Sequence, residues 1–118
     1  MSYVLVVDDQ ETVRDLLCRY LEAWSFRAHA TANAIEALAA METKQADIVV
    51  VDLQMPGKGG LWLAEQIHQR WPNTAIIIAT ADGYAAHRYE RIVKPFDRQQ
   101  MREVVERVAQ RAHLPPHT

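Results

Sequence analysis

Apolar residues follow two different spacings along the chain. Short runs of mostly branched apolar residues occupy positions 3–7, 48–51 and 75–79, and such runs are typical of strands buried on both faces of a parallel sheet. Residues 26–31 alternate apolar and polar side chains, as a short half-buried edge strand would. A further short strand is expected at 91–93. The pattern therefore predicts five strands.

Helical spacing separates these runs. A first helix is predicted over about 11–24, where Ser25 ends it, and Asn33 with Glu36 forms a capping-box-like pair for a second helix ending near 43. A third helix follows Gly59-Gly60, and Asp97 is a good N-cap for the last one. The side chains expected to face the core from these helices are Val13, Leu16, Leu17, Tyr20, Leu21, Trp24, Leu38, Met41, Leu61, Ala64, Ile67, Trp71, Met101, Val104, Val105 and Val108.

Strands that alternate with helices of this length indicate right-handed βαβ units. We predict an α/β fold, a (βα)5 doubly wound parallel sheet with strand order 2-1-3-4-5. Strands 1, 3 and 4 are then neighbours, and their carboxyl ends meet at one edge, where ligands bind in such sheets. Asp8-Asp9, Asp52 and Thr80 follow these three strands. The sequence therefore predicts an acidic cluster at this edge.

An acidic cluster of this kind stores electrostatic repulsion unless a cation neutralises it. Mg2+ is the natural ion, because it takes oxygen ligands and binds one or two carboxylates together with water and phosphate oxygens. One carboxylate is then left to act as a nucleophile toward a phosphoryl group, with Lys94 supplying further positive charge. The plainer alternatives are that Asp52 caps a turn and that Asp8-Asp9 caps the first helix.

Composition narrows the class of protein. The 118 residues suffice for one domain, and the 49% hydrophobic and 24% charged residues are ordinary for a globular protein. No apolar run approaches the roughly 18 residues of a spanning helix, and no basic leader precedes the first run, so we expect a cytoplasmic protein without membrane contact. A net charge of -2 with dispersed Lys and Arg argues against direct nucleic-acid binding. Cys18 is the only cysteine, so an internal disulfide is excluded.

Four motifs, each at a strand end, carry a family resemblance. They are Val6-Val7-Asp8-Asp9, Asp52-Leu53-Gln54-Met55-Pro56-Gly57 with Gly60, Thr80-Ala81, and Lys94-Pro95-Phe96. Because these four motifs occur together in this order, the sequence resembles a receiver domain of the two-component response regulators over nearly its whole length. The resemblance implies the flavodoxin-like receiver fold.

The same resemblance implies a metal site. By this resemblance, Asp9 ligates Mg2+ directly and Asp8 acts largely through water. Asp52 is a further ligand, and the backbone carbonyl of Gln54 is the third protein ligand. We therefore expect Mg2+ as the cofactor, bound by Asp8, Asp9, Asp52 and Gln54.

The resemblance also assigns the catalytic residues. Asp52 matches the phosphorylated residue, Thr80 the hydroxyl that hydrogen-bonds the phosphoryl group, and Lys94 the lysine of the family. The Lys94-Pro95 peptide bond matches one that is usually cis. The phosphoryl donor is expected to be a histidine kinase or a phosphotransfer protein.

The segment between Thr80 and Lys94 departs from the family pattern. Its 13 residues, 81–93, are too few for a full crossover helix and a strand, so helix 4 is expected to be short, irregular or absent. Arg91 stands where the family has its switch aromatic, and the nearest tyrosine is Tyr89. Tyr84 and Tyr89 are expected either to cover the apolar surface left by helix 4 or to anchor a partner. Phosphorylation-dependent dimers through helix 4, strand 5 and helix 5 are not expected.

We interpret the chain as a single-domain response regulator over residues 1–118, with a flexible tail at 113–118. Because no output domain is expected after 112, signalling would proceed through protein contacts or a phosphorelay to a target that the sequence does not name. The protein would be no enzyme beyond catalysing its own phosphorylation and dephosphorylation. The alternative is a pseudo-receiver that binds proteins without phosphorylation. An aspartate-nucleophile phosphatase is disfavoured, because Gln54 stands where that class needs a second aspartate.

Overall fold

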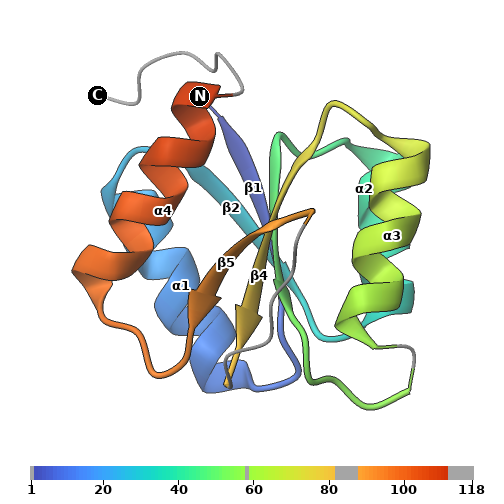
Figure 1. The fold of residues 1–118 in the computed structure, drawn as a ribbon, viewed down its shortest axis with the longest axis horizontal. Helices are drawn as coiled ribbons and strands as arrows, with labels where there is room; N and C mark the ends of the chain where they lie inside the picture. The colour runs from blue at the N-terminus through green and yellow to red at the C-terminus, as the bar shows by residue number, and fades with distance from the viewer. Residues whose placement is uncertain (1, 58, 82–87, 112–118) are drawn as a thin grey trace.

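The protein folds into a parallel five-stranded sheet covered by helices on both faces (Figure 1). The computed structural model describes residues 2–57, 59–81 and 88–111. The strands are β1 (Tyr3–Val7), β2 (Arg27–Thr31), β3 (Ile48–Asp52), β4 (Ala75–Thr80) and β5 (Glu90–Val93). They lie in the order β2-β1-β3-β4-β5, and each neighbouring pair is parallel. The predicted fold class and strand order are confirmed.

The described residues contain four helices, two on each face of the sheet. The helices α1 (Glu11–Ala23) and α4 (Arg98–Arg111) cover one face, and α2 (Ala34–Thr43) and α3 (Gly60–Arg70) cover the other (Figure 1). In this numbering α4 is the last helix of the chain. The segment in which a short or absent crossover helix was predicted includes 82–87, which lie outside the described residues, as does the predicted tail at 113–118.

Each central strand buries side chains on both faces. Alternate residues of the strands enter two separate cores, because successive side chains of a strand point to opposite sides of the sheet. The core under α1 and α4 contains Val4, Val6, Ile48, Val50, Ile77, Ala79 and Ile92. The core under α2 and α3 contains Leu5, Val7, Val49, Val51, Ile76 and Ile78. This burial on both faces explains why the sequences of these strands are continuous apolar runs.

The helix ends follow the sequence signals. Asn33 Oδ1 accepts a hydrogen bond from the Glu36 N–H at 2.9 Å, and Asp97 Oδ1 accepts one from the Gln100 N–H at 2.8 Å. Ser25 has a φ of 68°, a left-handed conformation that the helix cannot continue through. The expected caps and stop are therefore present.

Several helical positions differ from the predicted core, and Leu16 and Leu63 are the largest side chains among them. Leu16 was expected in the core, but it is 43% exposed and lies at the edge of the apolar stripe of α1. Leu63 was not expected there, yet it is completely buried beneath α3. The spacing of apolar residues locates a helix face to within about one residue on either side, and packing against the sheet decides which side chains at its margins are covered.

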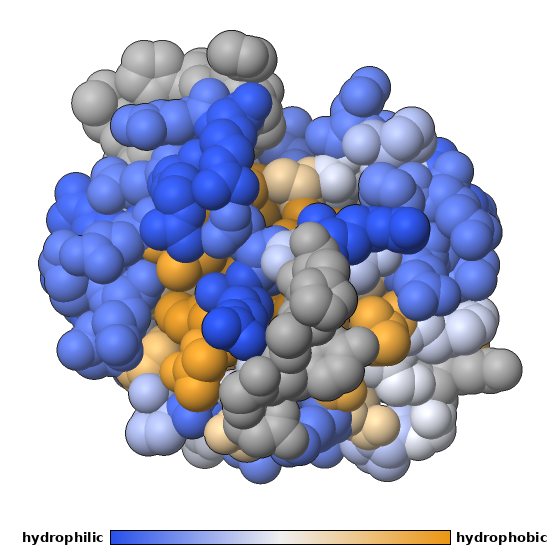
Figure 2. Space-filling view, in the orientation of Figure 1, coloured by the Kyte–Doolittle hydropathy of each residue, from blue (hydrophilic) through white to orange (hydrophobic). Residues whose placement is uncertain are grey.

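The surface over β4 and β5 combines polar and apolar groups. Figure 2 shows apolar side chains near the middle of this face, between polar surfaces over the helices. Glu90, at the start of β5, accepts hydrogen bonds from Arg107 and Arg111 of α4, and these contacts, that with Arg107 foremost, lower the pKa of its carboxyl. Val93 is 44% exposed. Among the described residues, no helix is long and apolar enough to span a membrane.

Candidate functional site

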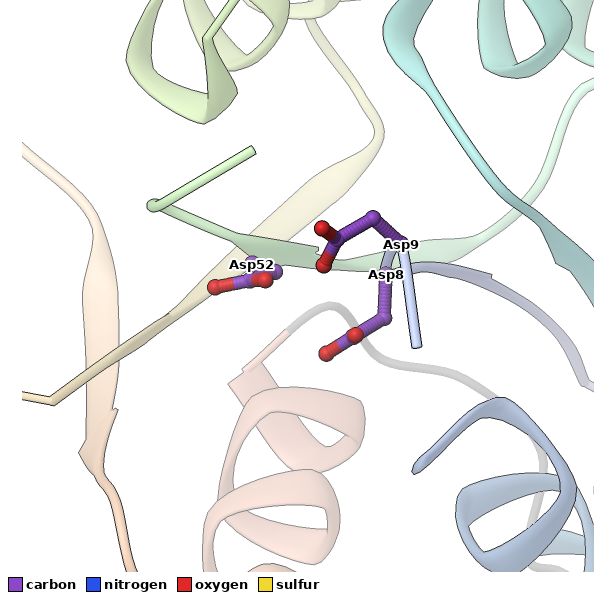
Figure 3. Close-up of side chains that lie close together, drawn as sticks. All are labelled: Asp8, Asp9 and Asp52. Atoms are coloured by element: carbon purple, nitrogen blue, oxygen red, sulfur yellow. The ribbon is translucent and has the colours of Figure 1, made fainter. Parts of the chain in front are cut away.

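Three carboxylates converge at the carboxyl ends of β1 and β3. One oxygen from each of Asp8, Asp9 and Asp52 lies within 4.8 Å of the others, and Figure 3 shows the three side chains lying close together. The parallel register explains the placement, because Val7 pairs with Val51 and the next residue of each strand is an aspartate. The predicted acidic cluster is therefore present.

Asp8 is the most constrained of the three. Its side chain is 3% exposed, and its Oδ1 accepts a hydrogen bond from the Gln10 N–H at 2.9 Å. Its Oδ2 accepts one from Lys94 Nζ at 3.2 Å, and its backbone carbonyl accepts one from Arg14 at 2.9 Å. Asp9 is exposed. With both oxygens of Asp8 bonded to protein donors, Asp9 is the carboxylate more accessible to a ligand.

Asp52 lies at the end of β3 and is 5% exposed. Its Oδ1 accepts a hydrogen bond from the Gln54 N–H at 3.1 Å and lies 3.3 Å from Lys94 Nζ. Burial raises the pKa of its carboxyl; the Gln54 N–H and Lys94 oppose this shift, and the charge of Asp8 adds to it. The net direction is upward, so Asp52 is a stronger base than an exposed aspartate.

Lys94 connects the two buried carboxylates. It follows β5, and its N–H donates to the Thr80 carbonyl at 2.7 Å, which aligns the ends of β4 and β5. Its ammonium reaches both Asp8 and Asp52. The Lys94-Pro95 peptide bond is cis, as the resemblance implied.

The remaining predicted site residues lie around this centre. Thr80 ends β4, is completely buried, and follows Ala79, the register partner of Asp52. Gln54 is exposed, and its backbone is fixed near Asp52 by the hydrogen bond described above. The geometry thus gathers all six predicted residues at one edge, while the roles assigned to them stay predictions.

Two further residues contribute to the site. A Cβ at Gly60 would lie 2.2 Å from the Asp52 carbonyl oxygen, so the start of α3 approaches the Asp52 backbone in a way that only glycine allows. Arg14 was not identified in the sequence, where it reads as one of several polar residues on α1. Its contact with Asp8 depends on the turn between β1 and α1, and no local motif signals it.

The donor set fits a hard divalent cation. Three converging carboxylates against one ammonium leave an excess of negative charge, and carboxylate oxygens are the ligands that Mg2+ prefers. Among the described residues, the Gln10 N–H, the Gln54 N–H and the Lys94 ammonium offset part of this charge. The residues present therefore fit the predicted metal.

Fold and site together define a class: a flavodoxin-like domain with an acidic, lysine-bridged centre at the carboxyl edge of its sheet. Residues 4–106 match the family model of the response regulator receiver domain, and the chain belongs to this family. Phosphoryl acceptance from histidine kinases, supported by Mg2+ at an acidic pocket, is the general function of receiver domains.

The curated relatives are longer proteins. The chain is 36% identical over 112 residues to the DNA-binding transcriptional regulator NtrC of Salmonella typhimurium, covering 88% of this chain and 24% of that protein. It is 38% identical over 113 residues to the transcriptional regulatory protein ResD of Bacillus subtilis, covering 89% and 45%. The chain thus spans less than half the length of either relative.

Solved structures agree with the fold. The response regulator TrrA of Thermotoga maritima, in complex with Mg2+ and BeF, superposes with a TM-score of 0.84 at 30% identity, covering 92% of this chain and 99% of that one. NtrX of Brucella abortus superposes with a TM-score of 0.89 at 27% identity, covering 96% and 28%. Chemotaxis protein CheY4 of Vibrio cholerae, at 23% identity, covering 92% and 98%, and a TM-score of 0.86, supports the fold alone.

Proposed function

We propose that this receiver domain accepts a phosphoryl group on Asp52 from a histidine kinase or a phosphotransfer protein in a Mg2+-dependent reaction. One observation carries the proposal: the Lys94 ammonium lies 3.2 Å from Asp8 and 3.3 Å from Asp52, while Asp9 of the same cluster stays exposed. A buried nucleophile, a fixed cation and an open carboxylate for a metal ligand are thus combined in one site.

Asp52 would react through Oδ2, because two N–H donors already engage Oδ1. The Oδ2–P bond forms as the P–N bond of the phosphohistidine donor breaks, and the leaving imidazole nitrogen takes up a proton. Burial favours this attack, since it strips water from the carboxylate and raises its basicity. The Gln54 N–H and Lys94 keep the carboxylate oriented during the transfer.

Asp9, Asp52 and the Gln54 carbonyl would hold the metal ion, with Asp8 acting through water. When bound, Mg2+ supplies the positive charge that neutralises the incoming phosphoryl oxygens. The exposed position of Asp9 and the engaged oxygens of Asp8 support this division between a direct and an indirect ligand.

The remaining roles belong to the same proposal. Lys94 stabilises the charge of the phosphoryl group on Asp52, and the Thr80 hydroxyl donates to one of its oxygens. The protein catalyses only its own phosphorylation and dephosphorylation, and it signals through protein contacts or by passing the phosphoryl group on. A cytoplasmic location, which a chain with Cys18 as its only cysteine suits, completes the proposal.

The test is labelling by acetyl phosphate with and without Mg2+, read as a mobility shift on a phosphate-affinity gel. We expect a shift that requires Mg2+ and that disappears in Asp52→Asn. A second reading comes from thermal unfolding, where Mg2+ should raise the melting temperature by mass action and Asp9→Ala should abolish the gain. Absence of both effects in the folded parent protein would favour a pseudo-receiver.

A further inference from the structure

We infer that Arg14 is a positioning residue, which orients the acidic pair Asp8-Asp9 for metal binding through the backbone that joins them. The inference rests on the proposed function. Arg14 lies in the first turns of α1, its side chain is half-buried, and its Nη1 donates to the Asp8 carbonyl oxygen at 2.9 Å.

This carbonyl belongs to the peptide unit between the two aspartates. Because the peptide unit is planar, a donor that fixes its oxygen also fixes the direction in which the Asp9 backbone leaves it. Asp9 is exposed, so packing contributes little to its orientation. The hydrogen bond from Arg14 therefore orients the Asp9 carboxylate through the backbone, without contacting the carboxylate itself.

Arg14 is part of a closed set of hydrogen bonds. The Arg14 N–H donates to the Gln10 carbonyl at 3.1 Å, and the Gln10 N–H donates to Asp8 Oδ1 at 2.9 Å. Two of these hydrogen bonds, from the Gln10 N–H and from the Arg14 guanidinium, join Asp8 at the strand end to the start of the helix. The third joins Arg14 to Gln10 within the helix start and closes the set. Gln10 is the N-cap of α1, its side chain forms no cap hydrogen bond, and its own N–H is the group that Asp8 Oδ1 accepts from. The turn and the helix start thus fix each other.

The charge of Arg14 and its position have opposite consequences for metal affinity. As a permanent cation beside the cluster, Arg14 alone would weaken the binding of a divalent cation. As the donor that orients the Asp8-Asp9 turn, it would strengthen the binding, because partners that orient metal ligands typically contribute about 10- to 100-fold in affinity. Removing the guanidinium therefore distinguishes a positioning role from a purely electrostatic one by the sign of the change.

The experiment compares the full chain with Arg14→Met, which keeps an unbranched apolar stem, and with Arg14→Lys, which keeps the charge and a donor. Arg19→Met is the matched control, an exposed arginine on the same helix. Mg2+ alone is titrated and followed by the amide resonance of Asp9, at about 0.1 M and about 1 M salt, where screening lengths are near 10 Å and 3 Å. The order parameter of the Asp9 amide is measured without metal.

We expect Arg14→Met to weaken Mg2+ binding about tenfold at both salt concentrations, to lower the metal-free order parameter of Asp9, and to be partly rescued in Arg14→Lys. The control should match the parent. Equal or tighter binding in Arg14→Met, or an unchanged order parameter, would overturn the inference. If the parent binds no Mg2+ and takes no phosphoryl group while the Asp9 amide loosens in Arg14→Met, the proposed function fails and the positioning role stands.

Discussion

Asp52 is a buried carboxylate that the fold stabilises only in part. Its donors, the Gln54 N–H and Lys94, favour the ionised form, but burial outweighs them and the pKa rises. Ionised Asp52 therefore destabilises the metal-free fold relative to the unfolded chain, where the group has an ordinary pKa. A bound cation or a covalent phosphoryl group would change the charge at Asp52, and with it the stability of the fold.

Asp52→Asn should raise the melting temperature in a chelator at neutral pH. The pKa of Asp52 in the folded state lies above its value in the unfolded chain, about 3.9. The destabilisation by ionised Asp52 is therefore complete at pH values above the folded pKa and absent at pH values below the unfolded pKa. The advantage of the variant should therefore shrink as the pH falls toward 4. Thermal unfolding across a pH series measures it. A variant less stable than the parent at neutral pH would show that the donors outweigh burial.

Gly60→Ala should destabilise the protein by about 1–3 kcal/mol, as other overpacked substitutions do. The added Cβ would meet the Asp52 carbonyl oxygen at 2.2 Å and the Leu53 Cα at 2.7 Å, both backbone atoms. The matched control is Gly59→Ala, where no heavy atom of the described residues, apart from the chain neighbours of Gly59, lies within 4 Å of the added Cβ. Urea unfolding of the two variants measures the difference. Equal free energies of unfolding would mean that α3 can shift without strain.

Among the elements, β5 and the residues before it are where we expect the chain to depart from the family pattern. Tyr89 packs against the core under α2 and α3 and contacts His68 edge-on, with ring centroids 6.2 Å apart. The pair lines a cavity of about 310 Å³, and the Tyr89 hydroxyl is buried with no hydrogen-bond partner among residues 2–57, 59–81 and 88–111. These contacts favour the covering role predicted for Tyr89 over the anchoring role. Tyr84 lies outside the described residues.

Tyr89→Ala should then lower the free energy of unfolding, whereas Tyr89→Phe should not. Truncation to alanine removes a half-buried ring and should cost about 2 kcal/mol of unfolding free energy, less than the 3–5 kcal/mol typical of fully buried aromatics. Phenylalanine keeps the ring and removes a buried hydroxyl that has no partner in the described part of the chain, so stability should be unchanged or raised. Chemical denaturation gives both values. A stable Tyr89→Ala with reduced partner binding would instead identify an anchor.

The extent to which sequence predicted this structure depends on the kind of contact. Asp8, Asp9 and Asp52 could be placed together because parallel strands end at a shared edge, which follows from strand order alone. Two other contacts could not be predicted from the sequence: that between Arg14 and the Asp8 carbonyl, and the close approach of Gly60 to Asp52. Both depend on the geometry of the turns between elements. Leu16 was misplaced because spacing predicts a helix face but not its margins.

For the molecule as a whole, we expect no phosphorylation-dependent dimer through the face that the family builds from helix 4, strand 5 and helix 5. Only 13 residues, 81–93, join β4 to Lys94 and include all of β5, and Arg91 stands where the resemblance implies a switch aromatic. Sedimentation of the Mg2+-loaded protein should give a monomer with and without beryllofluoride, a phosphoryl mimic. A symmetric dimer formed through β5 and α4 on addition of the mimic would refute this expectation.

The bond between Lys94 and Asp8 joins residues 86 positions apart, and it has a consequence for the order of events during synthesis. A ribosome releases Asp8, Asp9 and Asp52 long before Lys94, so the nascent chain carries the acidic residues without their fixed cation. The last strand must then insert beside β4 before the centre is complete. If the proposed function holds, the domain becomes able to accept a phosphoryl group only when β5 pairs with β4, and a nascent chain that lacks Lys94 should not accept one.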